Sequence, residues 1–262
     1  MSEIELPPDH PRYESLLTRH RIEVGAEKGI TSLQGLIAEG RGEAFDYLLG
    51  EETIESAARA ERVAAAHLLR AEHPVLSVNG NVAALVPEEL IELATVTGAK
   101  LEVNLFNRTD ERVEKITSHL REHGAEEILG TDPTEHIPGL SSERGKVDAE
   151  GIYRADVVCV PIEDGDRAEA LAAMGKTEIV IDLNPLSRSP RNAAVPVIDN
   201  VLRAIPNVTA HARELQSAET DLGGVIDAFD RETCLEDAEH RIRTGGENDS
   251  AERYPDPDPN PP

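Results

Sequence analysis

The chain has 262 residues, which is enough for one large α/β domain with a helical appendage. Its 51 acidic and 26 basic residues give a formal net charge of −25, so it repels nucleic acid and anionic membranes, and neither is expected as a partner. With 3% aromatic residues and no Trp, the core must consist of Val, Ile, Leu and Ala, which suits helices packed on a parallel sheet.

Only five of the 26 basic residues are lysine. A surface rich in acids and poor in lysine is typical of a very salty cytoplasm, where charges are screened within about 3 Å at 1 M ionic strength. An ordinary acidic protein is the alternative, and acidity spread over the whole chain argues against it. No secretory signal is present, and no apolar run has the ~20 residues that a membrane helix needs. The sequence therefore predicts a halophilic, cytoplasmic protein.

Residues 1–72 are predicted to form an N-terminal helical segment. An Ala-rich stretch at 54–72 has helical spacing and suits close packing against another helix, either within the chain or across a dimer contact. Before it, Gly40 and Gly42 flank Arg41, a pattern that allows either close approach of the backbone to a ligand or a tight turn.

Residues 73–218 alternate between apolar runs and helical patterns. The expected strands are 75–78, 100–105, 127–129, 156–161, 178–182 and 195–198. The expected helices are 88–97, 111–123, 164–175 and 200–215, the last one interrupted near Pro206. Residues 131–151 are expected to be irregular. This alternation predicts an α/β fold with a Rossmann-like, doubly wound, mostly parallel sheet.

The last part of the chain, residues 219–262, is predicted to be an acidic extension. Its end is rich in Pro and Asp, and it is expected to be disordered from about residue 244.

The first turn from strand to helix, Asn79-Gly80-Asn81, lacks both the Gly-x-Gly-x-x-Gly of dinucleotide sites and the P-loop pattern. This absence disfavours a Rossmann-type reductase that binds NAD(P). Two interpretations stay equally open: a helix N-terminus that takes a phosphate or carboxylate, and a turn without a ligand.

The loop at 181–191, after an expected strand, carries Arg188 and Arg191 beside two serines, and Asp199-Asn200 follows. Ligands of open α/β sheets bind at the carboxyl ends of the strands, and arginine holds phosphate oxygens bidentately. From these residues alone, exposed arginines paired with surface acids are slightly favoured over a ligand site. His119 and His123 have the spacing of a metal pair, but the charged residues around them favour a solvated helix face.

Eight blocks of sequence carry a resemblance to a known family. They are HPRYE at 10–14, EKGI at 27–30, GRGEAFDYL at 40–48, VNGN at 78–81, EVNLF at 102–106, EGIY at 150–153, EDGDR at 163–167 and DLNPLSR at 182–188. In this order they resemble the archaeal phosphopantothenate synthetases, also called 4-phosphopantoate–β-alanine ligases. The resemblance runs from about residue 10 to about residue 206 and leaves the acidic extension outside.

The resemblance implies a Rossmann-like homodimer that acts in coenzyme A biosynthesis. It implies ligation of 4-phosphopantoate to β-alanine with ATP and Mg²⁺, giving 4'-phosphopantothenate, AMP and diphosphate through an acyl-adenylate. The alternative is a nucleotide-binding sensor or scaffold on the same fold that has lost catalysis.

The resemblance also implies site residues, with residues 1–72 contributing to the active site. The implied ATP-binding residues are Arg19, Arg41, Asp182, Leu183, Asn184, Arg188, Ser189, Asp199 and Asn200. The candidates for catalysis are Arg41 and Arg188, which offset phosphoryl charge, and Glu43 or Asp46 as the base for the amine. The candidates for substrate binding are His10, Arg12, Asn79 and Asn81.

Two positions depart from the family pattern. Glu39 stands where the resemblance leads us to expect His, which leaves the role of that side chain open. Ser189-Pro190 replaces a Thr-Ala pair, and the hydroxyl expected at position 189 is retained.

Overall fold

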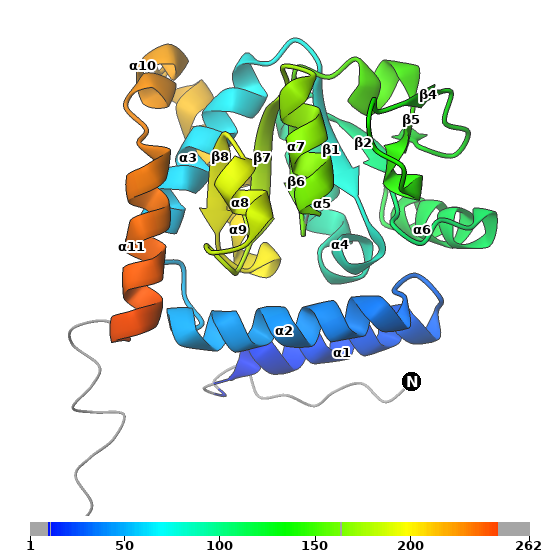
Figure 1. Ribbon diagram of the computed structural model, residues 1–262, viewed down its shortest axis with the longest axis horizontal. Coiled ribbons are helices and arrows are strands. Elements are labelled where there is room, and N and C mark those ends of the chain that lie inside the picture. Colours follow the sequence, from blue (N-terminus) through cyan, green and yellow to red (C-terminus); the bar gives the residue numbers. More distant parts are fainter. Residues whose placement is uncertain (1–9, 11, 163, 246–262) are drawn as a thin grey trace, which may run out of the picture.

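A computed structural model describes residue 10, residues 12–162 and residues 164–245. Its centre is a six-stranded sheet in the order β3-β2-β1-β6-β7-β8, and every neighbouring pair is parallel (Figure 1). The strands are β1 (Pro74–Val78), β2 (Lys100–Val103), β3 (Ile128–Leu129), β6 (Val157–Pro161), β7 (Thr177–Asp182) and β8 (Val195–Ile198). The strand order reverses between β1 and β6, as in a Rossmann-like sheet, so the predicted fold class is confirmed.

Helices cover both faces of the sheet, which explains why β1 and β6 are buried along their whole length. One face packs against α3 (Glu55–Arg70), α5 (Pro87–Thr97), α6 (Asp110–Glu122) and α9 (Val201–Ser217). On the other face lie α7 (Gly165–Ala173), α8 (Arg188–Asn192) and η2 (Ala149–Tyr153). A short hairpin of β4 (Glu135–His136) and β5 (Lys146–Val147), with η1 (Glu143–Gly145) before β5, fills the stretch predicted to be irregular.

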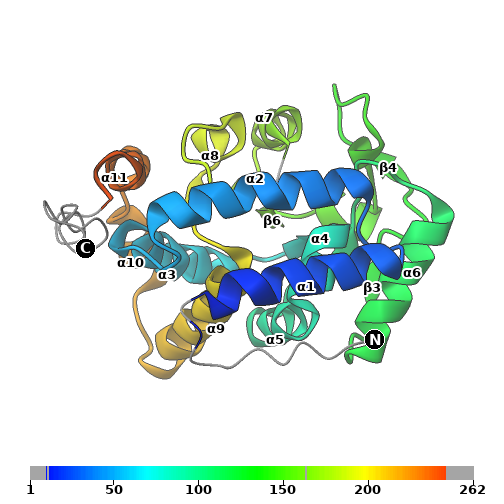
Figure 2. The same ribbon diagram turned by 90° about the horizontal axis from the view of Figure 1, so that it is seen from below.

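Two long N-terminal helices, α1 (Tyr13–Glu27) and α2 (Leu33–Leu49), lie side by side across one end of the sheet (Figures 1 and 2). This is the carboxyl end of the strands, where α4 (Gly80–Leu85) begins after β1. Ser32 caps α2 by accepting a hydrogen bond from the Gly35 N–H. The Gly-Arg-Gly pattern lies inside α2, so the tight turn proposed from the sequence is wrong. A Cβ at Gly42 would lie 3.3 Å from Leu183 Cδ1, which explains the glycine as a point of close approach between α2 and the loop after β7.

The acidic C-terminal region contains two helices, α10 (Leu222–Asp227) and α11 (Arg231–Thr244), that the sequence analysis did not predict. Cys234, Leu235 and Ala238 bury the inner face of α11, which packs against α2, α3 and β8. Arg241 donates from Nε to the carbonyl of Leu49, the last residue of α2, at 3.0 Å. The predicted disorder from about residue 244 falls almost entirely outside the described residues.

Two local expectations are wrong. Helix α9 continues through Pro206, because Ile205, Val208 and the buried residues beyond them hold its inner face in the core. His119 is buried rather than solvated, and its ring packs edge-on against that of His123 with 4.3 Å between centroids. In the described part of the chain, no helix is long and apolar enough to cross a membrane.

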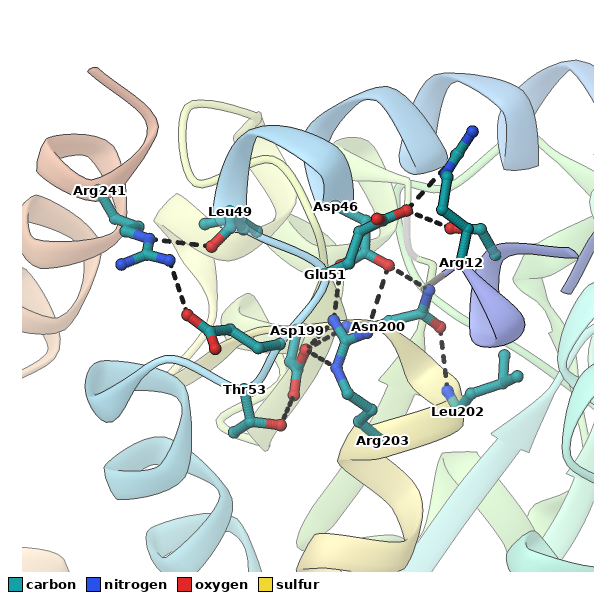
Figure 3. Close-up of polar contacts among 12 residues, drawn as sticks. Arg12, Asp46, Leu49, Glu51, Thr53, Asp199, Asn200, Leu202, Arg203 and Arg241 are labelled. Atoms are coloured by element: carbon teal, nitrogen blue, oxygen red, sulfur yellow. Dashed lines mark hydrogen bonds and ion pairs between the residues drawn. The ribbon is translucent and has the colours of Figure 1, made fainter. Parts of the chain in front are cut away.

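A buried charge cluster fastens α2 to the sheet (Figure 3). The Arg203 guanidinium from α9 bridges two carboxylates, with 2.6 Å from Nη2 to Asp46 Oδ1 on α2 and 2.6 Å to Asp199 Oδ1 after β8. Asn200 Nδ2 donates to Asp46 Oδ2 at 2.8 Å, and Thr53 Oγ1 donates to Asp199 Oδ2 at 2.6 Å. These contacts join residues 46–53 to residues 199–203, two segments that lie far apart in the sequence.

A third carboxyl group, Glu61 of α3, is fully buried beside this cluster. Asn207 Nδ2 donates to Glu61 Oε2 at 3.1 Å. Burial first, and then the neighbouring Asp199 carboxylate, raise the pKa of Glu61 well above its ordinary value. Glu61 is therefore protonated at neutral pH, which limits the negative charge that Arg203 must balance.

The first prediction concerns Glu61→Gln. The pKa of Glu61 is higher in the folded protein than in the unfolded chain. The protonated side chain therefore contributes fully to the unfolding free energy below about pH 4.5, and this contribution is lost as the pH rises toward the folded-state pKa. The substitution removes this loss, so the unfolding free energy of the variant relative to the wild type should rise with pH, by up to about 1.4 kcal/mol per unit. Denaturant unfolding between pH 5 and 8 measures this, with exposed Glu55→Gln on the same helix as the control. Parallel stability curves for Glu61→Gln and the wild type would contradict the assignment.

Candidate active site

Two adjoining cavities lie between α2 and the carboxyl ends of the strands. The first, which we call the strand-end cavity, has a volume of about 220 Å³. Its walls are Ala38, Glu39, Arg41, Gly42, Phe45, Ile162, Ile181, Asp182, Leu183, Asn184, Ser187, Ser189, Asp199, Asn200 and Val201. It is bounded by α2 on one side and by the ends of β6, β7 and β8 on the other.

The second cavity lies where the strand order reverses between β1 and β6, and we call it the switch-point cavity. Its volume is about 280 Å³. Its walls are Ser32, Gln34, Gly35, Ala38, Arg41, Asn79, Gly80, Asn81, Leu105, Phe106, Asn107, Arg112, Arg144, Ile162 and Asp164. Ala38, Arg41 and Ile162 line both cavities, so the two spaces meet beneath the middle of α2.

The loop after β7 is held in shape by its own side chains. Asp182 Oδ1 accepts from the N–H groups of Leu183 at 2.7 Å and Asn184 at 3.3 Å, and Oδ2 accepts from Ser187 Oγ at 2.9 Å. Burial raises the pKa of Asp182, while these donors and the nearby Arg41 favour its charged form. The loop is thus a preformed wall of the strand-end cavity.

The structure brings together seven of the nine residues expected to bind ATP, and all seven line the strand-end cavity. They are Arg41, Asp182, Leu183, Asn184, Ser189, Asp199 and Asn200. Arg188 does not line it: its side chain is 62% exposed, and its guanidinium lies 2.9 Å from Asp166 and 2.8 Å from Glu169. That placement matches the surface pairing that the loop residues alone slightly favoured.

The remaining expected ATP ligand, Arg19, lies in an ion-pair group between α1 and α2. Glu43 accepts from Arg19 Nη2 at 2.5 Å and from Arg12 Nη2 at 3.0 Å. The hydrogen bond from Arg19 is the largest cause that lowers the pKa of Glu43. His10 lies beside this group, where its Nδ1 accepts from the Arg12 N–H at 3.0 Å. None of these four side chains lines the described cavities between α2 and the strand ends.

The turn after β1 is clamped on both sides by its asparagines. Asn79 caps α4 through Oδ1 and donates from Nδ2 to the Pro161 carbonyl at 2.8 Å. Asn81 Nδ2 donates to the Gly35 carbonyl at 3.0 Å and to Glu39 Oε2 at 3.2 Å. A Cβ at Gly80 would lie 2.3 Å from the Ile30 carbonyl oxygen, so this glycine allows the connection between α1 and α2 to pack on the turn.

Two arginines of the switch-point cavity were not among the residues predicted from the sequence. Arg112 of α6 donates to the carbonyls of Asn107 and Ile30, and burial lowers its pKa. Arg144 of η1 is almost fully buried, with Nε 3.3 Å from Asp164 Oδ2. With Arg41, they put three guanidinium groups around one cavity of a strongly acidic chain, an arrangement suited to a phosphorylated ligand. No motif marks either residue in the sequence.

Glu39, whose role the sequence left open, is located by the structure at the strand-end cavity. It is partly buried, lines the strand-end cavity and contacts Asn81 of the neighbouring cavity. Burial is the largest cause that raises its pKa to about 6. Among the described residues, no group of three His, Cys, Asp or Glu side chains is arranged to hold a metal ion.

Comparison with known proteins gives a consistent result. A family model described as phosphopantothenate/pantothenate synthetase matches residues 56–245. A 4-phosphopantoate–β-alanine ligase of Thermococcus onnurineus is 57% identical over 242 residues, which cover 92% of this chain and 93% of the relative. The ligase of Methanosarcina mazei is 52% identical over 240 residues, covering 91% of this chain and 94% of the relative. The match extends to residue 245, so the expectation that the family likeness ends near residue 206 is wrong; α10 and α11 lie within it.

Proposed function

The chain belongs to the phosphopantothenate/pantothenate synthetase family, and from this premise we propose that it is a 4-phosphopantoate–β-alanine ligase of coenzyme A biosynthesis. The main structural support for the proposal is that two cavities meet at Arg41. A ligase that activates an acid with a nucleotide needs two such neighbouring sites, because the carboxylate must reach the α-phosphate.

We assign ATP to the strand-end cavity and 4-phosphopantoate to the switch-point cavity. The loop after β7 offers the nucleotide fixed polar groups, and Asp199 and Asn200 close the far side. Arg112 and Arg144 supply the switch-point cavity with charge for the substrate phosphate. The assignment leaves Arg188 and Arg19 outside the lining of the cavity, and their ion pairs with Glu169 and Glu43 would have to open for direct contact with ATP.

The first chemical step in this proposal forms the acyl-adenylate. A carboxylate oxygen of 4-phosphopantoate attacks the α-phosphorus of ATP, the bond from that phosphorus to the α,β-bridging oxygen breaks, and diphosphate leaves. Arg41 lines both cavities and is positioned to offset charge on the phosphoryl oxygens. In the second step the amine of β-alanine attacks the acyl carbon, and AMP leaves with the electron pair of the broken C–O bond.

Magnesium is part of the proposal as a companion of ATP. Mg²⁺ commonly keeps several waters and is held by substrate phosphates with one or two carboxylates, so it does not require a cluster of protein ligands. Bound to the triphosphate, it would neutralise phosphate charge.

The proposal extends to the working environment. An acid-rich chain with five lysines suits a saline cytoplasm, because high ionic strength screens its self-repulsion. We therefore propose that the enzyme is halophilic and cytoplasmic.

We also propose that the enzyme is a homodimer joined through the outer face of α2. Leu33 and Ile37 lie one turn apart on this face and are 77% and 68% exposed, and Tyr47 and Leu48 continue the apolar surface. Exposed apolar area costs roughly 25 cal/mol per Å², so a second copy that covers it would gain stability.

The ligase assignment predicts a defined set of products. Purified protein at high salt should form 4'-phosphopantothenate, AMP and diphosphate only when ATP, 4-phosphopantoate and β-alanine are all present. Mass spectrometry of the products measures this, and omission of each substrate is the control. Release of ADP and phosphate would contradict the adenylate route, and ATP binding without turnover would favour the sensor or scaffold.

The assignment of the substrate phosphate predicts the effect of Arg112→Gln. Loss of one charged hydrogen-bond partner costs about 1.5–3 kcal/mol, so the KM for 4-phosphopantoate should rise roughly 10- to 100-fold while the KM for ATP stays near the wild-type value. Steady-state kinetics measure both, and Arg121→Gln, an exposed position on the same helix, is the matched control. An equal rise in both KM values would contradict the separate assignment of the two cavities.

The dimer proposal predicts that Ile37→Glu yields monomers. A buried unpaired carboxylate opposes association, so light scattering should give the 28.4 kDa mass of one chain for the variant and twice that mass for the wild type. Gln34→Glu, which adds the same charge elsewhere on α2, should remain dimeric. A monomeric wild type would refute the proposal.

A further inference from the structure

Helix α2 carries three carboxylates near the site, Glu39, Glu43 and Asp46, and the last two are paired with cations. Glu43 is held by Arg12 and Arg19, and Asp46 by the buried Arg203 together with Asn200. An ion-paired carboxylate is stabilised in its charged form and is therefore a weak base. These contacts occupy both carboxylates, and neither of them lines the two cavities between α2 and the strand ends.

The third carboxylate, Glu39, has a different environment. Its Oε2 accepts a hydrogen bond at 3.2 Å from the side-chain amide of Asn81, which is uncharged. Asn81 donates from the same nitrogen to the Gly35 carbonyl, so the amide is fixed between α2 and α4. Glu39 is thus oriented by a hydrogen bond without being neutralised by that partner.

The position of Glu39 is as distinctive as its partner. Its side chain lines the strand-end cavity, whereas Asn81 lines the switch-point cavity, so the bond between them crosses the boundary of the two spaces. Arg41, two residues further along α2, lines both cavities at this boundary. An acid activated in one cavity by a nucleotide in the other would have its reacting carbon near this place.

We propose that Glu39 binds the ammonium group of β-alanine at the boundary between the cavities and acts as the general base that releases the free amine. This role rests on the proposed ligase function. A carboxylate oxygen of Glu39 takes one proton, and the N–H electron pair stays on nitrogen and then forms the bond to the acyl carbon. After attack the second proton passes from the nitrogen to solvent water, so that one of the three hydrogens remains on the amide. AMP departs as the dianion with the electron pair of the broken C–O bond, and Glu39 then returns its proton to solvent.

The acid–base properties of Glu39 suit the role. Burial, assisted by the charges of Asp46 and Glu43, raises its pKa to about 6, and the Asn81 hydrogen bond opposes this rise. The other charged side chains that line the strand-end cavity are Arg41, Asp182 and Asp199. At neutral pH Glu39 is therefore mostly a carboxylate, yet it is a stronger base than an exposed glutamate, as general-base catalysis requires.

The test separates the two chemical steps in Glu39→Gln, a change that keeps the size and polarity of the side chain. Exchange of labelled diphosphate into ATP, dependent on 4-phosphopantoate and measured without β-alanine, reports the first step and should stay within about threefold of the wild type. The kcat/KM for β-alanine should fall by roughly 10²- to 10⁴-fold, the usual contribution of a general base. Glu27→Gln, at an exposed position on α1, should change neither quantity.

A second nucleophile provides a readout that a folding defect would not give. Hydroxylamine is unprotonated at neutral pH and needs no base, so Glu39→Gln should form the hydroxamate of the substrate at a rate near that of the wild type. In the wild type, the kcat/KM for β-alanine should also fall on acidification with an apparent pKa near 6. The pH profile of the variant should show no inflection at this pKa.

The outcomes distinguish this proposal from the ligase function itself. Normal β-alanine kinetics in Glu39→Gln, or a parallel loss of exchange and amide formation, would overturn the role of Glu39 while the ligase function stands. Wild-type protein that neither exchanges diphosphate nor forms AMP with 4-phosphopantoate would overturn both.

Discussion

The structure depends on one guanidinium group that two carboxylates share. Arg203 joins Asp46 of α2 to Asp199 at the end of β8, and all three side chains are almost completely buried. Removing one partner from a buried ion pair typically costs about 3–5 kcal/mol, because the charge left behind has no water to replace the lost contact. Helix α2 therefore cannot slide or tilt over the strand ends without breaking this cluster. The cluster adds little net stability by itself, but it fixes the position of α2 over the carboxyl ends of the strands.

A fixed α2 has direct consequences for both cavities, because the helix forms a wall of each. Gly42 lets Leu183 approach the helix, Arg41 faces both spaces, and Glu39 lies where they meet. A shift of one residue along the helix would turn these side chains by about 100° and exchange their roles. The same buried contacts thus set the position of the groups that the proposed chemistry uses. In a chain with a net charge of −25, the local excess of arginine in the switch-point cavity can persist only because the fold holds those residues there.

Sequence patterns predicted the sheet well, because the strands of a parallel sheet are buried on both faces and appear as short apolar runs such as 157–160. They marked the loop after β7 as a candidate because its polar residues follow such a run, but these residues alone slightly favoured surface pairing, and the expectation of an ATP site came from the family resemblance. They failed for Gly40 and Gly42, since each glycine normally weakens a helix by about 1 kcal/mol, and here packing of α2 against α1, α4 and α11 overrides that preference. Arg112 and Arg144 could not be found among so many arginines, because only the fold brings α6 and η1 together. Helix α11 was missed because its acidic exposed face obscured the spacing of Cys234, Leu235 and Ala238.

The contacts that hold the end of α2 also determine when the site can form during synthesis. The helix is made early, but its partners come much later: the bond from Asn200 to Asp46 spans 154 residues, and that from Arg241 to Leu49 spans 192. Closing such long loops is slow, and proteins rich in distant contacts fold more slowly than those with local ones. The contacts of α2 with Asn200 and with α11 can therefore form only after these later parts of the chain have been synthesised. A truncated chain lacking α11 would leave the apolar end of α2, Phe45 and Leu49, without its cover and prone to aggregation.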